Sequence, residues 1–85
     1  MMCDGQRYET EWYGLRIVIE ERPTHFQVFS YDPGECEVLY TAERMSLDVA
    51  KFAAVDFVAT ARFGPSHDLK PEVVAEMLVW QNRLG

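Results

Sequence analysis

The chain has 85 residues, of which 48% are hydrophobic and 13% aromatic, a composition typical of a single folded domain with a modest core. The chain contains eight lysines and arginines and 14 aspartates and glutamates, so the net charge is −6. This sign argues against unassisted binding to nucleic acid or to anionic membranes, because neutralising phosphate groups requires clustered cations. The acidic excess belongs mainly to residues 1–45, which hold four cations and nine anions.

Compartment and domain organisation follow from what the sequence lacks. Cys3 and Cys36 are too few for a disulfide framework, and the first residues have neither the basic start nor the apolar core of a secretory signal. No apolar run approaches the roughly 18 residues that span a bilayer, so we expect a cytoplasmic protein without membrane contact. Residues 1–11 are polar and show no periodicity, which predicts a flexible N-terminal arm followed by a single domain over residues 12–85.

Three strands are predicted in the first half of the chain. Over residues 12–21, apolar and polar side chains alternate with the period of a half-buried strand. Aromatic and β-branched residues indicate a second strand over 25–31 and a third over about 36–41. Pro33 and Gly34 between them predict a type II turn with a positive φ at Gly34. Short connections make the three strands an antiparallel meander.

The longest stretch that predicts a helix covers residues 46–63, and we expect the other elements to pack around it. Ser46 suits the N-cap, Asp48 lies in the first turn where the helix dipole favours a negative charge, and Gly64 ends the helix. An α-helix turns by about 100° per residue, so side chains three or four residues apart lie on the same arc of its surface. The residues predicted to face the sheet are Ala50, Ala53, Ala54, Phe57 and Ala61.

A second helix is predicted to begin at Pro71, which suits the first helical position. Phe52 and Val55 lie outside the sheet-facing arc of the main helix, so the second helix is expected either to cover them or to reach a second subunit. Its apolar stripe consists of Val73, Val74, Met77, Trp80 and Leu84. The predicted fold is therefore α+β, a three-stranded antiparallel meander followed by two helices (β-β-β-α-α), with the main helix on one sheet face.

This arrangement leaves the other sheet face open, with an apolar centre surrounded by charged residues. Such a composition is typical of an interface patch, although solvated sheet faces share it. The candidate interface consists of Val18, Phe29, Tyr31, Leu39, Phe52 and Val55. We expect a non-catalytic, acidic protein-interaction module that self-associates, most simply as a homodimer, or that binds another protein.

No residue pattern predicts an enzyme. Ser66, His67 and Asp68 are the three residue types of a hydrolase triad, but neighbours along a chain point in different directions and do not form the relay. We expect them to form a loop with capping capability. Cysteines and histidines occur singly, without the spacing of metal ligands, and there is no glycine-rich phosphate loop. We therefore expect no catalytic residues, no cofactor and no metal.

Over residues 13–54 the sequence resembles a double-stranded RNA-binding domain. Residues 22–25 (RPTH) are similar to that family's G-P-x-H loop, and residues 46–54 (SLDVAKFAA) match the Ser, Ala, Lys and Ala positions of its last helix. The dipeptide Leu47-Asp48 replaces the two lysines that would contact phosphates, and the family's initial helix has no counterpart in residues 1–12. The resemblance therefore implies a relative of the RNA-binding domains that has lost phosphate-contacting lysines and binds protein instead. RNA binding is the alternative. Nucleic-acid contacts would then come from three residues: Arg22, His25 and Lys51.

A second resemblance, at the level of pattern, is to the HicB-like antitoxins. These are small acidic β-β-β-α domains that cover a basic toxin. Residues 46–50 (SLDVA) are similar to the short polar cap and turn that open the helix in that family. The resemblance implies an antitoxin-like partner of a small basic protein.

Overall fold

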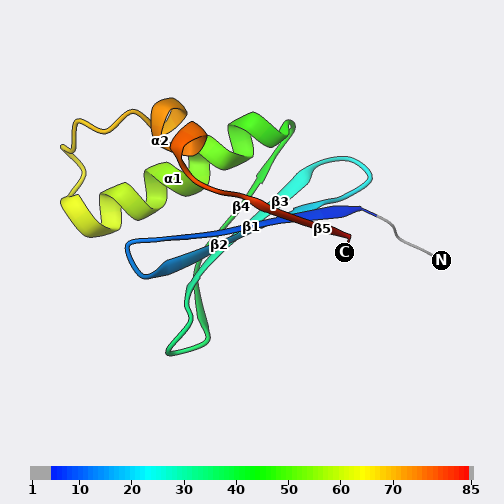
Figure 1. Cartoon of the computed structure of the whole chain (residues 1–85), viewed down its shortest axis with the longest axis horizontal. Coiled ribbons are helices and arrows are strands. Elements are labelled where there is room, and N and C mark those ends of the chain that lie inside the picture. Colours follow the sequence, from blue (N-terminus) through cyan, green and yellow to red (C-terminus); the bar gives the residue numbers. More distant parts are fainter. Residues whose placement is uncertain (1–4, 85) are drawn as a thin grey trace.

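The computed structural model describes residues 5–84. One antiparallel sheet of five strands, in the order β4-β3-β2-β1-β5, carries two helices on one of its faces (Figure 1). The elements in chain order are β1 (Gln6–Trp12), β2 (Leu15–Glu21), β3 (Phe26–Asp32), β4 (Glu37–Arg44), α1 (Leu47–Phe63), α2 (Pro71–Met77) and β5 (Gln81–Leu84). The α+β class and the β2-β3-β4 meander agree with the sequence prediction, but the sheet has two further strands.

The first of these strands is β1, formed by residues that were predicted to be a flexible arm. It lies between β2 and β5, with Tyr8 opposite Ile19 on one side and opposite Asn82 on the other. Tyr8 and Trp12 pack against the core, whereas the charged residues between them point to the open face. These charges obscured the strand. Glu9 is buried and forms ion pairs with Arg16 and Arg7, whereas Glu11 is exposed. Residues 1–4 of the expected arm lie outside the described residues.

The second additional strand, β5, occupies residues that were predicted to continue the second helix. That helix begins at Pro71 as expected, but it ends at Met77 because Leu78 is extended, with φ −76° and ψ 148°. The chain then pairs residues 81–84 with the free edge of β1. The apolar stripe therefore does not continue to Trp80 and Leu84 on a helix. Backbone hydrogen bonds to β1 are available only in the folded protein and favour the extended conformation.

Helix α1 agrees closely with its predicted bounds. The Ser46 hydroxyl accepts a hydrogen bond from the Val49 N–H at 3.2 Å, and Gly64 ends the helix with φ 94°. The predicted sheet-facing arc is only partly correct, because the helix is covered on two sides. The sheet buries Ala50, Ala54 and Val58, whereas Ala61 is exposed.

The second covering layer is α2 of the same chain. Val55 is fully buried in a cluster with Val74 and Ala75, and Phe52 packs partly buried against that cluster. Of the two alternatives left open by the sequence, the structure contains the helical hairpin. Val55 is therefore a core residue rather than part of a surface interface, and Phe52 belongs to the same internal packing.

Two hairpin turns require left-handed backbone conformations. In the β1–β2 turn Tyr13 has φ 51° and Gly14 has φ 80°, the pattern of a type I′ turn. In the β3–β4 turn the positive φ of 57° falls on Cys36, and Gly34 is not left-handed, so the type II prediction is wrong. The Asp32 carbonyl instead accepts hydrogen bonds from both the Glu35 and the Cys36 N–H. Among residues 5–84, no helix is long and apolar enough to cross a membrane.

Candidate functional site: an apolar groove

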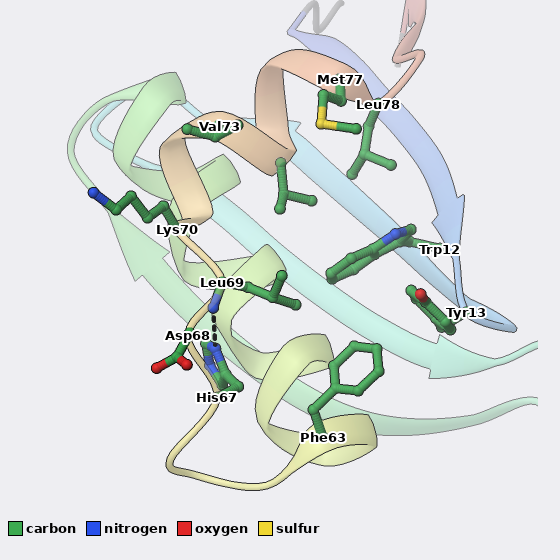
Figure 2. Close-up of a pocket in the computed structure, with 11 residues that line it drawn as sticks. Trp12, Tyr13, Phe63, His67, Asp68, Leu69, Lys70, Val73, Met77 and Leu78 are labelled. Carbon is green, nitrogen blue, oxygen red and sulfur yellow. Dashed lines mark hydrogen bonds between the residues drawn. The ribbon is translucent and has the colours of Figure 1, made fainter.

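A concave apolar surface, a groove of about 850 Å³, lies beside α2 (Figure 2). Three parts of the chain form it: the β1–β2 turn, the end of α1, and the stretch from the α1–α2 loop through α2. The first of these is distant in sequence from the other two. The lining residues of the groove are Trp12, Tyr13, Phe63, His67, Asp68, Leu69, Lys70, Val73, Val74, Met77 and Leu78. The volume and the apolar lining are in the range of sites that bind ligands or partner side chains.

One end of the groove is a cluster of three aromatic rings. Tyr13 makes edge-on contacts with Trp12, at 5.0 Å between ring centroids, and with Phe63, at 4.9 Å. The Arg62 Nε donates a hydrogen bond of 3.1 Å to the Tyr13 carbonyl, which attaches the turn to the end of α1. A left-handed backbone is unfavourable for a tyrosine. The turn thus holds a large ring at the groove although Asn or Gly would suit the backbone better.

The other end is formed by α2. Val74 and Leu78 line the groove as buried and half-buried side chains, whereas Val73 and Met77 are exposed at its rim. Of the ten large hydrophobic side chains that are exposed in the described part of the chain, five line this groove, with exposures from 38% for Leu69 to 74% for Met77. Scattered exposed apolar residues are ordinary, but a contiguous apolar surface indicates an interaction site.

His67 has a structural position in the loop beside the groove. Its Nδ1 accepts a hydrogen bond from the Leu69 N–H at 3.2 Å, and its Nε2 lies 3.3 Å from Asp56 Oδ1. The ring is nearly buried and both nitrogens are engaged, which leaves neither free to act on a substrate. Ser66 and Asp68 are exposed neighbours that form no relay with it. His67 therefore fixes the course of the loop that carries Leu69 into the groove.

The open face of the sheet contains the other predicted interface residues. Val18 lies directly opposite Phe29, and Tyr31 is next along β3 on the same face. Val18 is buried, Phe29 and Tyr31 are half-buried, and Leu39 is exposed where the register shifts between β3 and β4. Strand pairing therefore brings these four residues together, although most of their apolar area is already covered.

Glu9 is the centre of a charge network on the same face. It is only 6% exposed, its carboxylate accepts a hydrogen bond from Arg16 Nη2 at 2.8 Å, and Arg7 Nη1 lies 3.6 Å away. Desolvation raises the pKa of Glu9, but the Arg16 hydrogen bond and the charges of Arg83, Arg16 and Arg7 together lower this pKa below its ordinary value. The hydrogen bond to Glu9 in turn raises the pKa of Arg16. This network stabilises the sheet.

Two of the three predicted nucleic-acid contacts lie in the β2–β3 turn. Arg22 Nη2 is 2.6 Å from Glu20 Oε1, and the His25 ring lies 3.1 Å from the Thr24 hydroxyl. The Arg22 N–H also donates to the His25 carbonyl. Because a carboxylate already compensates Arg22, this turn offers little free positive charge to a phosphate backbone.

The third predicted contact, Lys51, lies on α1. Its ammonium group is 5.1 Å from the Trp80 ring centroid and 5.8 Å from that of Tyr8, within the range of cation–π attraction. The lysine thus connects α1 to the sheet and to the segment leading into β5. In addition, residues 6–12 form a strand where the RNA-binding resemblance implies a helix.

The residues at the rim of the groove were not predicted from the sequence. Val73 and Met77 were expected in a buried stripe, and no role was expected for Tyr13, Phe63 or Leu69. The Tyr13-Gly14 pair was the available signal, because a residue followed by glycine between two alternating segments indicates a hairpin. Among residues 5–84, no three His, Cys, Asp or Glu side chains are grouped so that they could hold a metal ion.

The fold and the groove define the protein as an α+β domain with one sheet face under a helical hairpin and an apolar recess at its end. No family model, no curated protein and no solved structure matches the chain.

Proposed function

We propose that this protein is a non-catalytic protein-interaction module that binds its partner, another protein or a second copy, through the groove beside α2. The observation that carries this proposal is the clustering of exposed apolar side chains from three segments around one recess. Their exposure is unfavourable in an isolated domain, and an apolar partner surface would remove it from water.

Further support comes from the chemistry of the surroundings. The groove combines aromatic and aliphatic walls with few polar groups, as in the centres of protein interfaces. Both ring nitrogens of His67, the histidine at its edge, are engaged within the chain. The exposed free thiol of Cys36 fits a reducing compartment, and we place this function in the cytoplasm.

A matched pair of valines allows a direct test. Val73 at the groove is 52% exposed, and Val38 in β4 is 51% exposed. Val73→Asp and Val38→Asp therefore make the same chemical change at equal exposure on two different surfaces. The tagged wild type and both variants would be used to capture and crosslink proteins from an extract of the cells that make the chain, after circular dichroism has shown that all three are folded.

We expect wild type and Val38→Asp to capture the same proteins, untagged copies of the chain included, and Val73→Asp to lose them. The interface would lie on the open sheet face instead if Val38→Asp lost the captured proteins and Val73→Asp retained them. If both variants behaved as wild type does, or if the wild type captured nothing, the proposed function would be wrong.

A further inference from the structure

The His67 side chain, which is only 8% exposed, connects the α1–α2 loop to α1. Its Nδ1 accepts a hydrogen bond from the Leu69 N–H at 3.2 Å, and its Nε2 lies 3.3 Å from Asp56 Oδ1. The backbone N–H of His67 donates to the Gly64 carbonyl. Figure 2 shows the hydrogen bond to Leu69 and the Leu69 side chain directed into the groove. One ring therefore links α1 to a wall of the groove.

These contacts require one protonation state of the His67 ring. A backbone N–H can only donate, so Nδ1 must keep its lone pair and carry no proton. In a neutral imidazole the proton is then on Nε2, where it faces the Asp56 carboxylate. A protonated ring has an N–H on both nitrogens, so the proton on Nδ1 would point at the Leu69 N–H. Protonation therefore removes the hydrogen bond to Leu69 and keeps the contact with Asp56.

Three parts of the chain place charged or titratable groups beside His67 or across the groove from it. These groups are Asp56 and Arg62 on α1, Asp68 and Lys70 in the loop, and Tyr13 in the β1–β2 turn. The α2 residues that line the groove are apolar. Asp56 pairs with the ring, whereas Asp68 and Lys70 are directed away from the groove (Figure 2). A protonated ring thus has a carboxylate on one side and a backbone donor that it repels on the other.

The second histidine of the chain lacks this conflict. His25 Nδ1 lies 3.1 Å from the Thr24 hydroxyl in the β2–β3 turn. A hydroxyl can donate to a neutral ring nitrogen or accept from a protonated one, so this contact tolerates a change of charge. The contact between His67 and the Leu69 N–H does not. Of the two histidines, His67 is therefore the one whose protonation changes the local structure.

We propose that His67 is a pH-sensitive switch in the wall of the groove. Its neutral form holds Leu69 in that wall, and its protonation releases Leu69. The loss of one hydrogen bond should lower the ratio of docked to released Leu69 about tenfold. The switch goes beyond the proposed function, because it belongs to the loop whatever the groove binds.

NMR spectroscopy of the wild-type chain tests the switch at the two ends of the range in which histidine commonly changes its charge, about pH 5 to about pH 8. At the upper end, long-range correlations of the ring nitrogens should show the His67 proton on Nε2. Nuclear Overhauser effects should connect the Leu69 methyl groups to other residues that line the groove. At the lower end, both ring nitrogens should carry protons, and these effects should lose most of their intensity. Circular dichroism at both ends would show that the chain stays folded.

Matched substitutions of the two histidines assign the response. The amide oxygen of an asparagine accepts a hydrogen bond from the N–H two residues further on and does not titrate. We expect His67→Asn to keep Leu69 in the groove wall at both ends of the pH range. The control His25→Asn should release Leu69 in acid as the wild type does, because the His67 contacts are unchanged.

Three results would overturn the inference: a wild-type His67 ring with its single proton on Nδ1 at the upper end of the range, wild-type Leu69 contacts that do not change with pH, or a response in acid that His25→Asn abolishes and His67→Asn retains. The first two are measured on the wild-type chain and do not depend on how a variant folds. Each of the three would leave the proposed function intact, because none of them involves a bound partner.

Discussion

We expect the substitution Glu9→Gln to lower the stability of the folded chain in a pH-dependent manner. Glutamine preserves the shape of the side chain and removes its negative charge. Glu9 is only 6% exposed, and its carboxylate lies among Arg16, Arg7 and Arg83. Without its charge, three guanidinium groups remain close together on the open sheet face, and the hydrogen bond from the positively charged Arg16 loses its anionic acceptor.

The expected loss follows from that single hydrogen bond. A hydrogen bond between two oppositely charged groups is stronger than one in which a single partner is charged, and we expect the loss of the carboxylate charge to cost about 1 kcal/mol. For a domain of this size, about 1 kcal/mol corresponds to a decrease of about 4–8 °C in Tm. The pKa of Glu9 is lower in the folded state than in the unfolded state. The ionised Glu9 therefore stabilises the fold above the ordinary carboxyl pKa, and this stabilisation is lost as the pH falls through the lowered pKa.

Urea unfolding followed by tryptophan fluorescence at pH 7 and at about pH 2.5 measures both effects. Glu9→Gln should unfold at lower urea than wild type at pH 7, and the difference should shrink in acid. The neighbouring Glu11→Gln, an exposed residue on the same strand, serves as the control and should change little. Equal stability of Glu9→Gln and wild type at pH 7, or a difference that does not depend on pH, would refute this account.

Three further substitutions concern local structure. Gly14→Ala should destabilise the chain by about 1 kcal/mol, because Gly14 is left-handed with φ 80°; an unchanged Tm would contradict this. Ser46→Ala should remove about 1 kcal/mol by loss of the hydrogen bond that Ser46 accepts from the Val49 N–H, seen as a lower urea midpoint, whereas Ser46→Asp should retain the cap. Ser30→Ala should be neutral or stabilising by up to about 1 kcal/mol, because the buried Ser30 hydroxyl has no hydrogen-bond partner among residues 5–84; a marked loss of stability in calorimetry would disprove it.

Much of the helical layer was predictable from local signals. Ser46 and Gly64 set the ends of α1, and Pro71 set the start of α2. The alternation predicted a strand over residues 12–21, and β2 covers residues 15–21 of that range. In β1 the prediction of no periodicity was wrong. Tyr8 and Trp12 face the core and alternate with charged residues, which made the segment resemble solvated chain.

The site was less predictable than the fold. Val73 and Met77 have helical spacing with Val74, which suggested one buried stripe. Only Val74 and Ala75 are buried in the cluster with Val55, and the early end of the helix at Met77 leaves the outer residues exposed. Which apolar residues of a short helix stay outside depends on its rotation against α1, and no local pattern encodes that rotation.

By itself, the sequence determined the local elements: the main helix with its caps, three strands joined by short turns, and an acidic surface. These follow from interactions within a few residues, namely capping hydrogen bonds, side-chain periodicity and turn conformations. The tertiary structure alone decided that residues 6–12 and 81–84 pair as neighbouring strands and that Trp12, Phe63 and Val73 meet around one groove. The reason is physical, since a strand edge and an exposed apolar surface are defined by contacts between segments up to 78 residues apart, such as Gln6 and Leu84.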